Sequence, residues 1–157
     1  MRFAGLVVVA AAALVAGCDG GGSVGGLDAE RVFTIPLTTM EEIPRPSSST
    51  AAGTAQIIVY PSQVEFTLAA NGITGITMAH IHSGAAGNTG PIVVTLFQPS
   101  NATGSVSGIF ATGTLNANTL PSSVTLESLK TLLASGNSYV NVHTTANPLG
   151  EIRGQIR

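Results

Sequence analysis

The residues best suited to chemistry are three histidines, which lie in two short segments far apart in the chain. The segments read Met78-Ala79-His80-Ile81-His82 and Tyr139-Val140-Asn141-Val142-His143. Side chains alternate between the two faces of a strand, so His80 and His82 share one face, and Asn141 and His143 share another. If the apolar members of each segment turn toward the core, all three imidazoles are expected on the outer surface of a sheet.

Such a cluster has two interpretations. Imidazole ligates copper and zinc, so His80, His82 and His143 could form a three-ligand site with an open position for water or substrate. Asn141 and Glu151 could then serve as partners for the second ring N–H of an imidazole. Alternatively, the imidazoles bond to loop carbonyl groups and lock the two segments together. From the sequence we favour this structural role, with the metal site as the alternative.

Length and charge narrow the classes of protein. The chain has 157 residues, of which 9% are charged, and its formal net charge is −2. This length suits one domain with a real core, and the low charge provides no basic surface for nucleic acid. Nucleic acid is therefore not an expected partner.

The apolar pattern predicts short strands and one short helix. The helix follows Thr125 as its N-cap, places Leu126, Leu129 and Leu133 on one face, and ends at Gly136. In the first predicted strand, Pro36 suggests an edge position, and Asn71-Gly72 is expected to form a turn. The predicted strands are Val32–Leu37, Gln56–Tyr60, Gln63–Leu68, Ile73–His82, Pro91–Phe97, Ser105–Leu115, Tyr139–His143 and Glu151–Arg157.

The beginning of the chain predicts export and a lipid anchor. Arg2 precedes an uncharged apolar run that ends at Leu14-Val15-Ala16-Gly17-Cys18, which resembles the lipobox of bacterial lipoproteins. Cys18 is the only cysteine, so it is better explained as an acylation site than as half of a disulfide. We expect a signal peptide at 1–17, a flexible Gly-rich tether at 18–30, and a folded domain at 31–157 outside the cytoplasm.

Three segments together resemble the CHRD domain, which is named after chordin, an extracellular antagonist of bone morphogenetic proteins, and also occurs in bacterial exported proteins. They are Met40–Pro44, His80–Val93, and Tyr139–Thr144 with Pro148–Gln155. The resemblance covers about residues 31–157 and implies an all-β fold. We expect an antiparallel β-sandwich of an immunoglobulin-like or superoxide-dismutase-like Greek key type, with one short helix. The resemblance leaves the biochemical role of bacterial members undefined.

A looser similarity concerns the histidines. The His-x-His pair followed much later by His143 is similar to the layout of copper ligands in copper/zinc superoxide dismutases. The pattern is incomplete, because the loop Ser83–Pro91 contains no histidine or aspartate to bridge a second metal ion, no disulfide can form, and no arginine can be assigned a substrate-guiding role. Dismutation is therefore not expected, even with a metal bound.

Other enzyme signatures are missing from the sequence. Gly84, Gly87 and Gly90 lack the lysine of a phosphate-binding loop, and the one Gly-x-Ser-x-Gly run, at residues 21–25, lies in the predicted flexible tether and not in a strand-to-helix elbow. The sequence therefore favours a membrane-anchored binding or structural protein that contacts an unknown protein or envelope polymer. The alternative is a mononuclear copper or zinc protein that acts in redox protection or metal handling.

Overall fold

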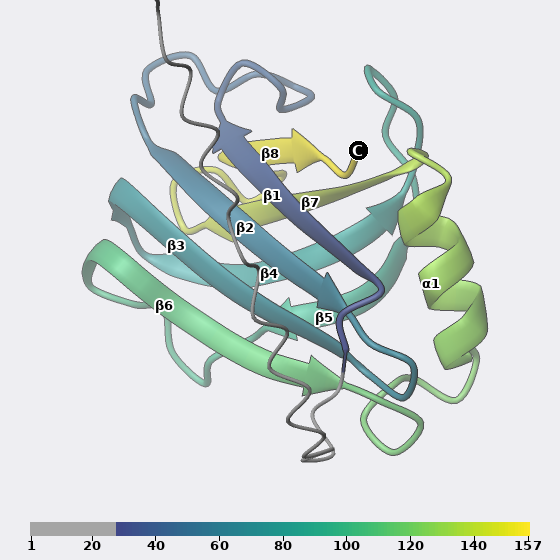
Figure 1. Ribbon diagram of the computed structural model, residues 1–157. Coiled ribbons are helices and arrows are strands. Elements are labelled where there is room, and N and C mark those ends of the chain that lie inside the picture. Colours follow the sequence, from purple (N-terminus) through teal and green to yellow (C-terminus); the bar gives the residue numbers. More distant parts are fainter. Residues whose placement is uncertain (1–27) are drawn as a thin grey trace, which may run out of the picture.

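The computed structural model describes residues 28–157, which form eight strands and one helix (Figure 1). The predicted signal peptide, Cys18 and most of the tether lie outside the described residues, so these remain predictions. Within 28–157, no helix has the length and apolar character needed to cross a membrane. The elements are β1 (Arg31–Thr38), β2 (Ala52–Val59), β3 (Val64–Thr74), β4 (Ile76–Ser83), β5 (Ile92–Phe97), β6 (Ser105–Leu115), α1 (Leu126–Ala134), β7 (Ser138–Thr144) and β8 (Ile152–Gln155).

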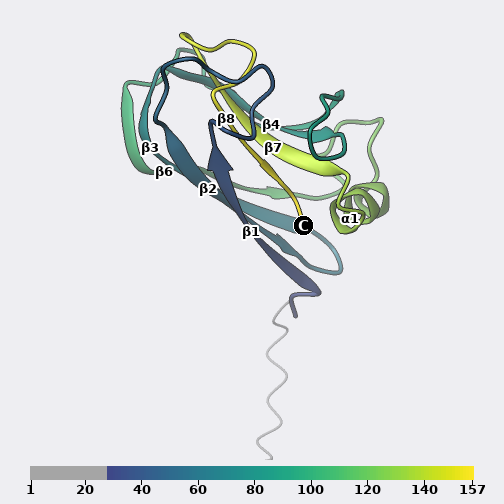
Figure 2. The ribbon, with the colours of Figure 1, turned by 90° about the horizontal axis from the view of Figure 1, so that it is seen from above.

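The strands form one antiparallel sheet in the order β5-β4-β7-β8-β1-β2-β3-β6, which folds over into a nearly closed sandwich (Figures 1 and 2). The half made of β5, β4, β7 and β8 joins the other half at a single register pair, Thr38 with Arg153. On the open side, the rings of Phe97 in β5 and Phe110 in β6 meet edge to face at 5.4 Å. The predicted all-β antiparallel fold with one short helix is confirmed.

The core lies between the two halves and follows the predicted alternation. In β1, Phe33, Ile35 and Leu37 are buried, whereas the residues between them are exposed. The helix begins with a capping box, in which the Thr125 side chain accepts a bond from Ser128 N while Ser128 Oγ accepts one from Thr125 N. Its buried leucines close one end of the core, as predicted.

Two local predictions were wrong. Pro36 does not lie in an edge strand, because β1 is flanked by both β2 and β8. A proline is tolerated there because β8 pairs with β1 only at Thr38, which leaves the strand without a ladder partner on that side. The Asn71-Gly72 turn is instead a bulge within β3, and the chain reverses at Gly75. Gly72 and Gly75 both have positive φ, so composition alone does not distinguish the bulge from the turn.

Candidate metal centre

Strands β4 and β7 are neighbours, and this pairing brings the two histidine segments together. His80 lies opposite Asn141, and His82 lies opposite Tyr139. On the other face of β4, Ala79 and Ile81 are fully buried in the core, as are the valines of β7. The predicted alternation is therefore confirmed, and all three imidazoles share the face of the sheet that points away from the apolar core.

The predicted exposure of the histidines was wrong. His80 is 2% exposed, and His82 and His143 are each 8% exposed. Loops on both sides fold over this face: His82 Nδ1 is 2.9 Å from the Gly90 oxygen, and His143 Nδ1 is 3.0 Å from the Pro148 oxygen. Alternation determines only which face a side chain occupies, and a covering loop then decides whether that face meets water.

These two carbonyl contacts determine which ring nitrogen carries the proton. A carbonyl oxygen can only accept, so Nδ1 of His82 and of His143 must donate. In the neutral rings, Nε2 then carries no proton and presents a lone pair. His82 Nε2 is buried and has no hydrogen-bond partner, while His143 Nε2 lies 3.1 Å from His80 Nδ1. Metal-ligating histidines commonly have this arrangement, in which one ring nitrogen bonds to an outer carbonyl and the other is free for the ion.

The separations within the cluster are close to those around a single ion. One ligand nitrogen from each histidine can be chosen such that all three lie within 4.8 Å of one another. Nitrogens that ligate zinc or copper at about 2.0–2.1 Å lie on the order of 3–3.5 Å apart. The 3.1 Å between His80 Nδ1 and His143 Nε2 falls within that range, whereas the 4.8 Å limit for the whole set is longer, so the three rings would have to draw closer to hold one ion.

The electrostatic environment keeps the imidazoles neutral. Burial lowers the pKa of His80 to about 4, with further lowering from the neighbouring His143 and His82. Burial is also the main cause of the lowered pKa values of His82 and His143. Because only the unprotonated imidazole ligates a metal, all three rings are in the ligating form at neutral pH.

The two residues predicted to support the imidazoles behave differently. The Asn141 side chain contacts the cluster, with its Oδ1 3.1 Å from His143 Nε2. Two acceptors do not form a hydrogen bond, so with His143 Nε2 unprotonated the amide must be turned to present its nitrogen there. Glu151 instead accepts bonds of 2.6 Å from the hydroxyl groups of Ser49 and Thr144. Its two oxygens link the segment before β2 to the end of β7, so the structure gives Glu151 no imidazole partner.

The arrangement of these segments matches a known family. The profile of the CHRD domain matches residues 33–156. The chain belongs to the CHRD family. No curated protein and no solved structure matches it, so neither supplies residue roles for this CHRD domain.

Arg153 lies on the polar face of the CHRD domain, which is the face of β4, β7 and β8 that carries the histidines. It is 1% exposed and lies across the Tyr139 ring, with its guanidinium carbon 3.4 Å from the ring centroid. The His82 ring stacks on the same tyrosine at 4.8 Å with an interplanar angle of 7°. Arg153 also donates to the Asn88 oxygen at 2.8 Å, which ties the covering loop to β8. Nothing in the sequence revealed this contact, because it depends on β8 pairing with β7.

The polar face also contains several unsatisfied atoms. Among residues 28–157, the buried side-chain atoms with no hydrogen-bond partner are Glu42 Oε2, His82 Nε2, Arg153 Nη1 and Gln155 Oε1. Native proteins bury few such atoms, since each carries a desolvation cost. Their concentration around the histidines sets this face apart from an ordinary structural network.

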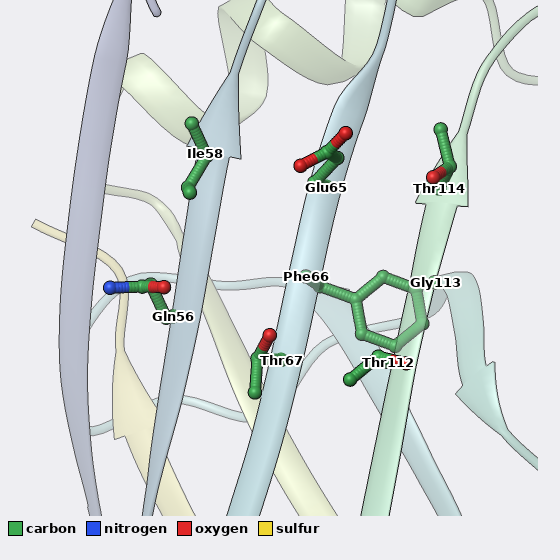
Figure 3. A pocket seen from close by; sticks show the side chains of 8 residues that line it. All are labelled: Gln56, Ile58, Glu65, Phe66, Thr67, Thr112, Gly113 and Thr114. Carbon is green, nitrogen blue, oxygen red and sulfur yellow. The ribbon is translucent and has the colours of Figure 1, made fainter.

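A hollow elsewhere on the molecule has no comparable chemistry. It has a volume of about 240 Å³ and lies on β2, β3 and β6, as Figure 3 shows. Its only acidic group, Glu65, already accepts a 2.7 Å bond from Gln63. Gly113 lies against the Phe66 ring, which a Cβ at Gly113 would approach to 2.6 Å. The hollow offers no cluster of ligating groups, so the histidine cluster is the candidate site.

Proposed function

We propose that this CHRD domain binds a single copper or zinc ion through His80, His82 and His143. The observation that carries the proposal is the buried, unpartnered Nε2 of His82 in a cluster of three histidines whose ligand nitrogens can be chosen within 4.8 Å of one another. An ion would satisfy the His82 acceptor without displacing a proton, and it would replace the hydrogen bond that His143 Nε2 accepts from His80 Nδ1. The ion would have an open position for water or another ligand.

The structural role that the sequence favoured explains only part of this geometry. Bonds to loop carbonyls account for one nitrogen of His82 and one of His143. They leave His82 Nε2 without a donor, whereas His143 Nε2 contacts both His80 Nδ1 and the Asn141 side chain. A purely structural site would be expected to satisfy His82 Nε2 as well, because an unmatched acceptor costs about 1–3 kcal/mol. This imbalance moves our preference to the metal site.

We further propose that the site operates outside the cytoplasm on a lipid anchor at Cys18. The lipobox-like sequence around Cys18 and the Gly-rich segment after it support this placement. A domain held in this way would handle metal at the membrane surface, or would use it in protection against oxidants. Contact with a partner protein or an envelope polymer, the other function considered from the sequence, stays a prediction.

The decisive experiment is metal analysis of the purified chain after incubation with copper or zinc and dialysis. The wild type is expected to retain about one ion per chain. His82→Ala should lower affinity by more than the 10–100-fold typical of losing an outer-shell partner. Glu65→Gln changes a carboxylate on the opposite half of the sandwich and should retain the ion. A wild-type chain that keeps no metal, while circular dichroism shows it folded, would overturn the proposal.

A further inference from the structure

Met78 lies in the same row of side chains as the histidine pair. It precedes the buried Ala79 in β4, so its side chain lies on the face that carries His80 and His82. In the ladder with β7 it is directly opposite His143. Met78 is half-buried, whereas Ile76 and Ala79 on the core side are fully buried. Core packing therefore does not account for the methionine at this position.

The register places Met78 next to His143, beside a β-bulge between Ile76 and Met78. Side chains directly opposite each other in an antiparallel pair have Cβ atoms about 4.5–5.5 Å apart. Methionine is unbranched and has three rotatable side-chain bonds, so it can adapt to a nearby partner. The His143 nitrogen closest to His80 is Nε2, and an ion held there would lie beside the strand position of Met78.

We propose that Met78 supplies a thioether as the fourth ligand and makes the site selective for copper over zinc, above all for Cu(I). This inference rests on the proposed metal-binding function. Imidazole suits both metals, whereas the soft thioether sulfur selects Cu(I). A ligand set of three imidazoles and one thioether therefore distinguishes two ions that three imidazoles alone accept.

The chain offers a matched control for this ligand. Met40 is 72% exposed in the loop after β1, so Met40→Leu removes a thioether that has no place in the cluster. Met78→Leu removes the candidate ligand with little change in volume, which favours a folded variant. A near-ultraviolet circular dichroism spectrum and a urea unfolding curve establish the folding of both variants.

The experiment measures the affinities of the purified full chain for Cu(I) and Zn(II) by competition with chromophoric chelators, without oxygen and with a reductant for copper. Met78→Leu should weaken Cu(I) binding roughly 10–100-fold and change Zn(II) binding less than about twofold, since the lost ligand is soft. Met40→Leu should match the wild type for both ions. X-ray absorption of the Cu(I) form should show one sulfur neighbour in the wild type and in Met40→Leu, and none in Met78→Leu.

The two proposals fail in different ways. If the folded wild type binds neither ion, the metal-binding function is overturned and the role of Met78 with it. If the wild type binds Cu(I) but Met78→Leu binds it equally well and no sulfur neighbour is detected, only the role of Met78 is overturned. An equal loss of Cu(I) and Zn(II) affinity in Met78→Leu would also overturn the selectivity, because it would indicate a general disturbance of the site.

Discussion

At the scale of single residues, His80 shows how burial changes chemistry. It is the one histidine whose nitrogens have no bond to a backbone carbonyl among the described contacts, and it lies closest to the other two rings. Its own charge would be desolvated and would repel a charge on His143 or His82. The cluster is therefore stable with neutral rings, and it becomes unstable when acid forces protons onto them.

We expect the metal-free protein to lose stability as the pH falls from 6.5 toward about 4. Between these values the unfolded chain binds a proton at His80 and the folded chain does not, so stability rises with pH across this window. The difference between the two pKa values corresponds to roughly 3 kcal/mol for His80. The lowered pKa values of His82 and His143 act in the same direction.

Urea unfolding with a chelator present, at pH 7 and at pH 4.5, measures this loss. His80→Gln should show a smaller loss than the wild type, since Gln has no proton to take up. Burial raises the pKa of Glu42, so just above pH 4.5 protonation of Glu42 makes the folded state more stable as the pH falls. This partly offsets the loss of stability in both proteins. Equal losses in the two proteins would contradict the assignment to His80.

At the scale of elements, the crossing of β8 and β1 holds the polar face in place. The two strands share one register pair, yet Gly154 brings the backbones close together. A Cβ at Gly154 would meet the carbonyl oxygen of Pro36 and would come within 2.6 Å of Ile35 Cγ2. The neighbours of this glycine are Arg153 and Gln155. Their side chains donate to the carbonyl oxygens of Asn88 and Gly84, in the loop after β4 that covers His82.

Gly154→Ala is expected to destabilise the protein by about 3 kcal/mol, because a rigid backbone rather than a flexible side chain must move. The free energy of unfolding in urea measures the effect. Gly104→Ala is the matched control, since nothing lies within 4 Å of a Cβ at Gly104. That variant should stay within about 0.5 kcal/mol of the wild type. Equal stability of both variants would show that β8 can shift away from β1 at little cost.

At the scale of the whole molecule, the folded domain connects to its proposed anchor through the chain that precedes β1. Glu30, just before β1, forms an ion pair with Lys130 of α1, with 2.8 Å between Glu30 Oε2 and Lys130 Nζ. Glu30 therefore lies beside the helix. A lipid at Cys18 would hold the entire domain at a membrane without any membrane-spanning contribution from the fold.

In a bacterial host, the wild-type chain should partition into the detergent phase of a phase-separation extraction, because several acyl chains on one residue give lasting attachment. Cys18→Ala should move to the aqueous phase or accumulate as uncleaved precursor. Ser23→Ala, in the proposed tether, should behave as the wild type. Detergent partitioning that survives Cys18→Ala, with the signal segment removed, would rule out a lipid at this residue.

Much of the architecture follows from local rules, and these explain which predictions were confirmed. Alternation in β1 and β4 correctly separated core residues from the opposite face, and Thr125 marked the start of α1. Alternation, capping and turn preferences act over a few residues, so they can be read without knowing the fold. Gly72 and Pro36 were misassigned because the correct assignment depends on which strand lies alongside.

The amino-acid order was enough to establish an all-β chain of the CHRD family and to place three histidines on one face of its sheet. It did not reveal that this face is buried, that Arg153 and Tyr139 stack beside His82, or that Met78 lies opposite His143. Those facts depend on strand order, on register and on loops that return over the sheet from elsewhere in the chain. Each joins residues that are distant in sequence, so only the assembled fold could bring them together.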